Sequence, residues 1–118
     1  MKNLREWQMK NLTDALRWLS DANTQEKSWI LHEGQYIPVF SELICQLFDD
    51  TGLQDIIDEN ILENFFPEDV CAYIYSLNKA VSQVNQSLPL NEMLNSPEML
   101  VLRYEANRLL LALPPKPV

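Results

Sequence analysis

The sequence predicts an all-α fold, a compact single domain built from five to six amphipathic helices, and three observations support this prediction. The chain has 118 residues, the length of one domain, and 47% of them are apolar, which is enough for a buried core. It contains only two glycines, so tight β-hairpin turns are scarce and the stretches between helix breakers are long. Within those stretches apolar residues recur every three to four positions, as on one face of a helix. We assign residues 1–113 to a single helical domain and residues 114–118 to a proline-rich C-terminal tail.

The first two helices are expected over residues 4–19 and 24–31. The first has an apolar stripe that includes Trp7, which we therefore place in the core. A polar break at residues 20–23 offers Asn or Thr to cap the second helix. Gly34 is expected to adopt the left-handed conformation that follows the end of that helix.

The third and fourth helices are expected over residues 38–48 and 53–64. Pro38 suits the first turn of a helix, where its missing N–H is not needed. The Asp-Asp-Thr-Gly sequence at residues 49–52 separates the two helices. The apolar positions of the fourth helix alternate with acidic ones at helical spacing, so its outer face is predicted to be acidic.

The fifth and last helices are expected to begin at Pro67 and Pro97. In both, proline is followed by carboxylates, which favour the positive end of the helix dipole. The apolar stripes continue to Val84 and Leu113, and a loop or short turn is expected over residues 86–94. Prolines at three of the next five positions after Leu113 prevent the last helix from continuing.

The acidic residues are concentrated in the middle of the chain. Residues 28–78 carry ten acids and no Lys or Arg, whereas residues 1–27 and 79–118 each carry a net charge of +1. The net charge of −8 therefore originates in one segment. Surface helices usually mix both signs, because like charges three or four residues apart repel each other. Such a segment attracts basic proteins, although a face that only maintains solubility is the alternative interpretation.

We predict that part of this segment forms a partner-binding surface. The expected contact residues are Asp49, Asp50, Asp55, Asp58, Glu59 and Glu63, with Glu68, Asp69 and Tyr36 at the rim. Tyr36 and Trp29 flank the turn that opens the segment, and aromatic residues are frequent at the centres of protein interfaces. Trp18 lies nearly opposite the first helix's apolar stripe and is expected to be exposed.

Signatures of catalysis and of cofactor binding are not found in the sequence. His32 is the only histidine, and no nucleophile or orienting group is marked as its partner. The segment around Gly52 fails as a calcium-binding loop, because Leu47 occupies the first ligand position. Asp55 and Glu59 share one helix face, for which a solvated face is the favoured interpretation over a metal site. We predict a protein that is not an enzyme, with no catalytic residues, no cofactor and no metal.

Binding to nucleic acid or to a membrane is also not expected. The nine bases are dispersed and outnumbered by seventeen acids, and phosphate binding needs clustered Lys and Arg. No stretch approaches the roughly 18 apolar residues that span a bilayer, and charges interrupt the N-terminus, so no signal peptide is expected. Cys45 and Cys71 are interpreted as reduced, buried thiols of a cytoplasmic protein.

Several segments resemble one group of bacterial proteins. These are LTDALRWLSDANTQEKSWI at residues 12–30, with Gln25 and Trp29 starting a segment, LFDD at residues 47–50, and the last helix at residues 96–110. Together they resemble small helical proteins encoded beside polymorphic or contact-dependent toxins. The resemblance implies an immunity protein.

The sequence thus leads to two hypotheses of different classes. The first is an immunity protein, as a monomer or as a heterodimer with its toxin. It would neutralise a basic nuclease by covering the active-site or substrate-binding surface with acidic side chains. The alternative is a helical adaptor or subunit that docks a cellular protein through an apolar groove, which predicts exposed apolar surface and weak dependence on salt.

Overall fold

Helices make up the regular structure of residues 2–113, the part of the chain that the computed structural model describes. The predicted proline-rich tail, residues 114–118, lies outside this part. The described residues form seven α-helices, three short π- or 3₁₀-helical turns and no strand. These elements are α1 (Glu6–Ser20), α2 (Ala22–Gln25), η1 (Glu26–Ile30), α3 (Phe40–Cys45), η2 (Gln46–Asp50), α4 (Leu53–Asp58), η3 (Leu62–Asn64), α5 (Glu68–Gln83), α6 (Leu90–Leu94) and α7 (Pro97–Ala112). The all-α single-domain prediction is confirmed, with seven helices instead of five to six.

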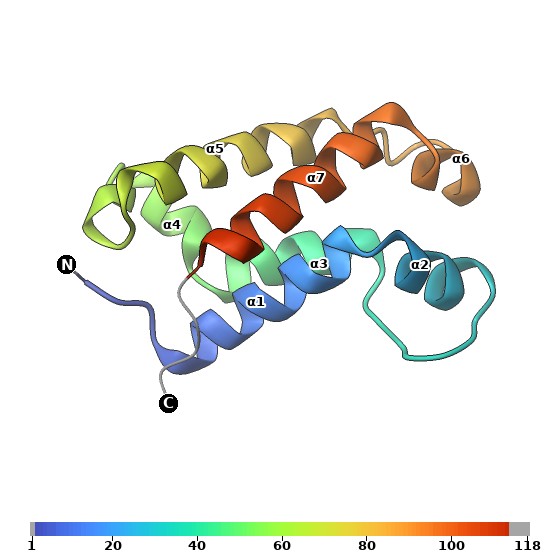
Figure 1. Ribbon diagram of the computed structural model, residues 1–118, viewed down its shortest axis with the longest axis horizontal. Coiled ribbons are helices and arrows are strands. Elements are labelled where there is room, and N and C mark those ends of the chain that lie inside the picture. The colour runs from blue at the N-terminus through green and yellow to red at the C-terminus, as the bar shows by residue number, and fades with distance from the viewer. Residues whose placement is uncertain (1, 114–118) are drawn as a thin grey trace.

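Three long helices, α1, α5 and α7, form the framework of the fold. Helix α7 runs diagonally across the front of the molecule in Figure 1, with α5 on one side and α1 on the other, and it packs against both. Helices α3 and α4 lie behind this layer (Figure 1). The fully buried residues of the framework are Leu12, Ala15, Leu16 and Leu19 of α1, Ile74 and Leu77 of α5, and Met99, Leu102, Ala106 and Leu109 of α7.

Polar side chains hold together the end of the molecule where α1, α2, α6 and α7 meet. Gln25 is fully buried, and its Nε2 donates to the carbonyl oxygens of Trp18 and Leu19 at 2.8 and 3.0 Å. Its Oε1 accepts a hydrogen bond from Arg103 Nε at 3.0 Å. Arg103 also donates to the carbonyl oxygen of Leu94 at 2.7 Å, and burial lowers the pKa of its guanidinium below the usual value. This cluster satisfies carbonyl groups that the helix ends leave unpaired.

Two hydrogen bonds from residues of η1 hold the end of the long loop between η1 and α3. Trp29 Nε1 donates to the carbonyl oxygen of Pro38 at 3.0 Å, and Ser28 Oγ accepts from the backbone N–H of Ile37 at 3.1 Å. Ile37 is fully buried. Pro38 therefore belongs to the loop, and α3 begins two residues later than predicted. Trp29 is 6% exposed, so it belongs to the core and not to a partner interface.

Residues in the left-handed conformation end two helical segments. Asn60 has φ 58°, its N–H bonds to the carbonyl of Ile57, and the N–H of Ile61 bonds to that of Ile56. This is a Schellman motif, which stops α4 at Asp58 and not at residue 64 as predicted. After η1 the corresponding residue is His32, with φ 54°, while Gly34, at φ 68°, lies two residues further on.

Four further predictions need correction. Trp7 is 54% exposed, because it lies five residues before Leu12, or about 140° around the helix from the buried stripe. Trp18 is half-buried against the core instead of exposed. Cys45 is exposed, whereas Cys71 is buried as predicted. The expected loop over residues 86–94 contains the short helix α6, whose Met93 and Leu94 are buried.

Candidate partner-binding surface

Eight acidic residues lie on consecutive elements at one end of the molecule, and we call this surface the acidic end. Its members are Asp49, Asp50, Asp55, Asp58, Glu59, Glu63, Glu68 and Asp69, and all eight are exposed. They belong to η2, α4, η3, the first turn of α5 and the turns between them. Helix α4 and the start of α5 lie together at the left-hand end of Figure 1. The predicted contact residues other than Tyr36 are therefore exposed on elements that follow one another along the chain.

Helix α4 supplies the centre of the acidic end. Its inner face buries Leu53 and Ile56, so the helical repeat turns Asp55, Asp58 and Glu59 toward solvent on one outer face. Gln54 Nε2 donates to Asp58 Oδ1 at 2.9 Å. The spacing of three and four residues makes the three carboxylates neighbours on that face.

The turn before α4 positions Asp49 and Asp50. Thr51 is fully buried and its hydroxyl donates to the Leu47 carbonyl at 2.6 Å while accepting from the N–H of Leu53 at 3.2 Å. Gln8 of α1 donates to the Thr51 carbonyl at 2.7 Å. A buried threonine thus fixes the turn from inside, and the two aspartates before it remain in solvent.

Three carboxylates from η3 and α5 gather around the thiol of Cys71. Burial raises the pKa of the Cys71 thiol, and the nearby charges of Glu63, Asp69 and Glu68 raise it further. The thiol donates to the carbonyl oxygen of Phe66 at 3.5 Å. Burial is the larger cause, and the carboxylates add to it because a nearby negative charge disfavours the thiolate.

Cys71 should therefore report the electrostatic field of the acidic end. We expect the pKa of its thiol, followed by the ¹³Cβ chemical shift, to fall when Glu63, Glu68 and Asp69 are replaced together by Gln, Gln and Asn. It should stay above the usual thiol value, because burial is the larger cause. An unchanged pKa would mean that the three carboxylates do not act on the thiol.

The same raised pKa has a consequence for stability. As pH rises, the thiol of the unfolded chain loses its proton before the thiol of the folded chain. The contribution of Cys71 is therefore present below the ordinary thiol pKa and is lost as pH rises through the higher folded pKa. The difference in unfolding free energy between wild type and Cys71→Ala should decrease over this alkaline range.

No ion pair in the described part of the chain involves a carboxylate of the acidic end. Within residues 2–113 the ion pairs are Lys10–Asp14, Arg17–Asp14 and Arg108–Glu105, all inside α1 or α7. The backbone N–H of Lys2 donates to the carbonyl of Asn64 at 2.7 Å, which places the start of the chain beside η3. Because none of the described bases pairs with its carboxylates, the acidic end attracts cationic surfaces over the range of the Debye length.

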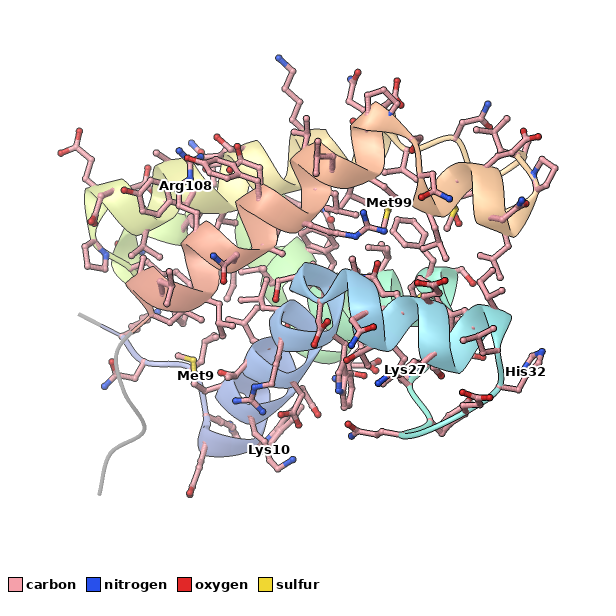
Figure 2. The ribbon with its side chains drawn as sticks, turned by 45° about the vertical axis from the view of Figure 1, so that its right-hand side comes forward. Met9, Lys10, Lys27, His32, Met99 and Arg108 are labelled. Carbon is pink, nitrogen blue, oxygen red and sulfur yellow. The ribbon has the colours of Figure 1, made fainter. Side chains whose placement is uncertain are left out.

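Tyr36 lies apart from the acidic end. It is 77% exposed and belongs to the loop at the lower right of Figure 1, whereas α4 is at the left. Figure 2 shows that His32 lies on this same side of the molecule, opposite Arg108. Among the described residues no cluster of His, Cys, Asp and Glu could hold a metal ion. No helix in residues 2–113 has the length and apolar content for crossing a bilayer.

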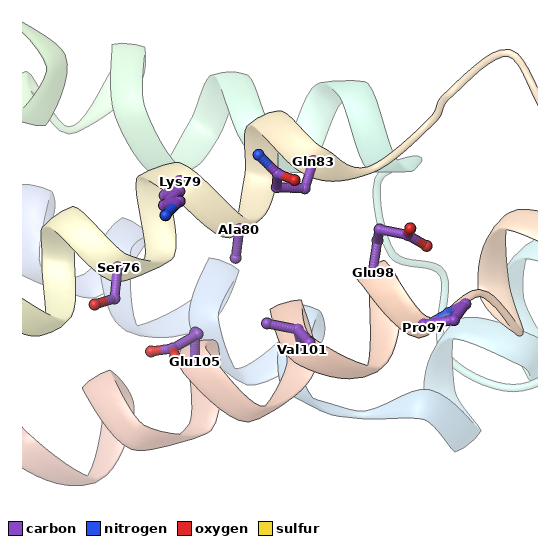
Figure 3. A pocket seen from close by; sticks show the side chains of 8 residues that line it. All are labelled: Ser76, Lys79, Ala80, Gln83, Pro97, Glu98, Val101 and Glu105. Carbon is purple, nitrogen blue, oxygen red and sulfur yellow. The ribbon is translucent and has the colours of Figure 1, made fainter.

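Sequence reasoning missed the exposed apolar surface around α7. A groove of about 430 Å³ runs between α5 and α7, lined by Ser76, Lys79, Ala80, Gln83, Pro97, Glu98, Val101 and Glu105. Figure 3 shows the Lys79 and Gln83 side chains on one wall and Val101 on the other. Beside the groove, Leu100, Tyr104 and Leu111 are also exposed. The sequence does indicate this surface, because Leu100, Tyr104 and Leu111 are apolar or aromatic and lie outside the inward stripe of the last helix.

Comparison with known proteins gives no match to any family model, to any curated protein or to any solved structure.

Proposed function

We propose that the protein is an immunity protein that binds a basic toxin through its acidic end and acts in the cytoplasm without catalysis. The toxin would be a nuclease, and the acidic end would cover its active-site or substrate-binding surface. The observation that supports this function best is the row of eight exposed carboxylates without paired bases within residues 2–113.

A nuclease must bind the phosphate backbone of its substrate. A surface that binds a phosphate backbone carries Lys and Arg, and exposed carboxylates on a rigid helical scaffold can take the place of the phosphates. Opposite fields also accelerate encounter by orders of magnitude over neutral surfaces. The repulsion among Asp55, Asp58 and Glu59, a few tenths of a kcal/mol for each pair, is an energetic cost that this function would explain.

The first experiment is a pulldown with this protein as bait, from cells that carry its native locus, at low and at moderate salt. We expect one basic partner whose nuclease activity is silenced in the complex, and whose association rate falls as salt rises. Recovery of a housekeeping complex, or of nothing, would contradict the proposal.

Charge reversal of the centre of the acidic end should weaken this complex. We expect Asp55→Lys/Asp58→Lys/Glu59→Lys to lower affinity for the partner by about 100-fold or more, mostly through the association rate, while helicity is retained. The measurement is surface plasmon resonance together with circular dichroism.

A matched variant controls for net charge. Glu26, Glu33 and Glu92 are all exposed and lie on η1, the adjoining loop and α6, toward the other end of the molecule. Their triple reversal to Lys changes the net charge by the same amount and should leave affinity within about threefold. Equal effects of the two triple variants would show that only net charge matters, and unchanged affinity in the first would refute the proposed surface.

The second candidate is the adaptor function, which the groove between α5 and α7 favours. Its occupant would be an amphipathic helix whose apolar side chains contact Ala80 and Val101. This complex would show little dependence on salt, and it would be lost in Val101→Lys and retained in the acidic-end triple variant.

A further inference from the structure

Helix α7 has two apolar faces, and the core covers only one of them. The inner face is fully buried, as described above. On the outer face Leu100, Tyr104 and Leu111 are 67%, 62% and 77% exposed, and Asn107 between them is exposed as well. In Figure 1 no other described element passes over the front of α7. We call Leu100, Tyr104, Asn107 and Leu111 the outer stripe.

The spacing of the outer stripe fits a second helix. Its residues are separated by four, three and four positions, which is the spacing of the a and d positions that form the seam between two packed helices. This series reads the same in both directions. Such a stripe is self-complementary when two identical helices run antiparallel, because a two-fold axis then pairs the first residue of one helix with the last residue of the other.

We propose that the outer stripe is the interface between two copies of this protein, with the α7 helices antiparallel about a two-fold axis. The axis passes between Tyr104 and Asn107. Leu100 then packs against Leu111 of the second copy, and Tyr104 lies opposite Asn107. A polar residue in such a seam fixes the register at some cost in stability.

Charge favours a second copy in this orientation. Helix α7 has no net charge, because Glu98 and Glu105 are balanced by Arg103 and Arg108. It therefore has no net charge that would attract a strongly charged partner. The acidic end lies toward one end of the molecule's longest dimension of 42 Å, the end to which the C-terminus of α7 points (Figure 1). Antiparallel pairing keeps the two acidic ends apart, whereas parallel pairing brings them side by side.

Tyr104, the aromatic residue of the outer stripe, is in contact with Arg108 before any partner binds. The guanidinium carbon of Arg108 lies 4.4 Å from the centroid of the Tyr73 ring and 5.6 Å from that of Tyr104. The same Arg108 pairs with Glu105, so Tyr104 stacks on a cation that is itself fixed. A pre-ordered tyrosine loses less side-chain entropy when a partner covers it.

The area of the patch predicts a weak dimer. The apolar residues of the outer stripe and Val101 beside them, at the edge of the groove, together expose on the order of 500 Å² per copy, so the pair would bury roughly 1,000 Å², at the low end for specific interfaces. We therefore expect a dissociation constant in the range of about 1 to 100 µM.

Sedimentation velocity from about 1 µM to 1 mM should show a shift from monomer to dimer. Leu111→Lys should remain monomeric over this range, although it lowers the net negative charge and thus the repulsion between copies. Leu31 is 50% exposed on another element, so Leu31→Lys is the matched control and should dimerise like wild type. Circular dichroism verifies folding, and Leu100→Lys serves as the second variant of the stripe. Higher salt should strengthen the dimer by screening repulsion.

Cysteine pairs test the orientation in a Cys45→Ser background. A mixture of Leu100→Cys and Leu111→Cys chains should form the mixed disulfide, whereas Leu100→Cys alone should not, because positions 100 of two antiparallel helices lie about 16 Å apart along the axis. A monomer at every concentration, a dimer that survives both lysine variants, or preferential linking of two Leu100→Cys chains would overturn the proposal. Its failure would leave the immunity function untouched, since that function rests on the acidic end.

Discussion

Replacement of Leu102 by alanine is expected to lower the free energy of unfolding by about 3 kcal/mol. Leu102 is fully buried at the centre of α7, where it packs into the core shared with α1 and α5. The substitution removes its transfer free energy and leaves a cavity that three packed helices cannot close without distortion. Urea unfolding followed by tryptophan fluorescence gives the measurement, at a protein concentration of about 0.1 µM, below the expected dimer range.

Leu100→Ala is the matched control on the same helix, two residues away. Because Leu100 is 67% exposed, its truncation should change stability by less than about 0.5 kcal/mol in the monomer. Comparison of Leu102→Ala with Leu100→Ala thus distinguishes the face of α7 that is buried in the monomer core from the face that we assign to the contact with a second copy. A loss of similar size in both variants would contradict the placement of α7.

Replacement of Gln25 by leucine is expected to destabilise the fold by about 3 kcal/mol. Gln25 is fully buried, and leucine of similar size would leave Arg103 Nε without its acceptor and would remove the side-chain donor of the Trp18 and Leu19 carbonyls. Unpaired buried polar groups cost more than the bonds themselves contribute. Thermal and urea unfolding of Gln25→Leu provide the test.

A double-mutant cycle with Arg103→Met identifies the cause. If the two side chains act as one cluster, the double variant should lose clearly less stability than the two single variants combined, since neither partner is then left alone. Losses that simply add would show that the 3.0 Å hydrogen bond between them carries no coupling.

The two proposed surfaces respond to salt in opposite directions. Binding through the acidic end is an attraction between unlike charges, which salt weakens. Pairing through the outer stripe brings together two copies of net charge −8, and salt relieves their repulsion. One salt series on the free protein and one on its complex therefore distinguish the two surfaces without any mutation.

Local sequence signals account for much of this fold. Pro67 and Pro97 mark helix starts that the structure confirms to within one residue, because proline and the following carboxylates act within a single turn. Exposure of the acidic residues was equally predictable, since unpaired carboxylates are costly to bury. Asn60 is a typical residue for ending a helix in the left-handed conformation, but the apolar spacing continues past it to Ile61, so the sequence predicted a longer α4.

Tertiary structure decided the features that depend on distant residues. Gln25 and Arg103 are 78 positions apart, and nothing local marks either as half of a buried pair. Trp29 and Tyr36 are equivalent aromatic candidates in the sequence. In the structure Trp29 is buried and donates to the Pro38 carbonyl, whereas Tyr36 is exposed in the loop. The sequence alone thus determined the helices and the sign of the charge, because these follow from interactions within a few residues. The tertiary structure decided that the second apolar face of α7 stays exposed, because the packing of α1 and α5 against the first face is set by long-range contacts and leaves Leu100, Tyr104 and Leu111 uncovered.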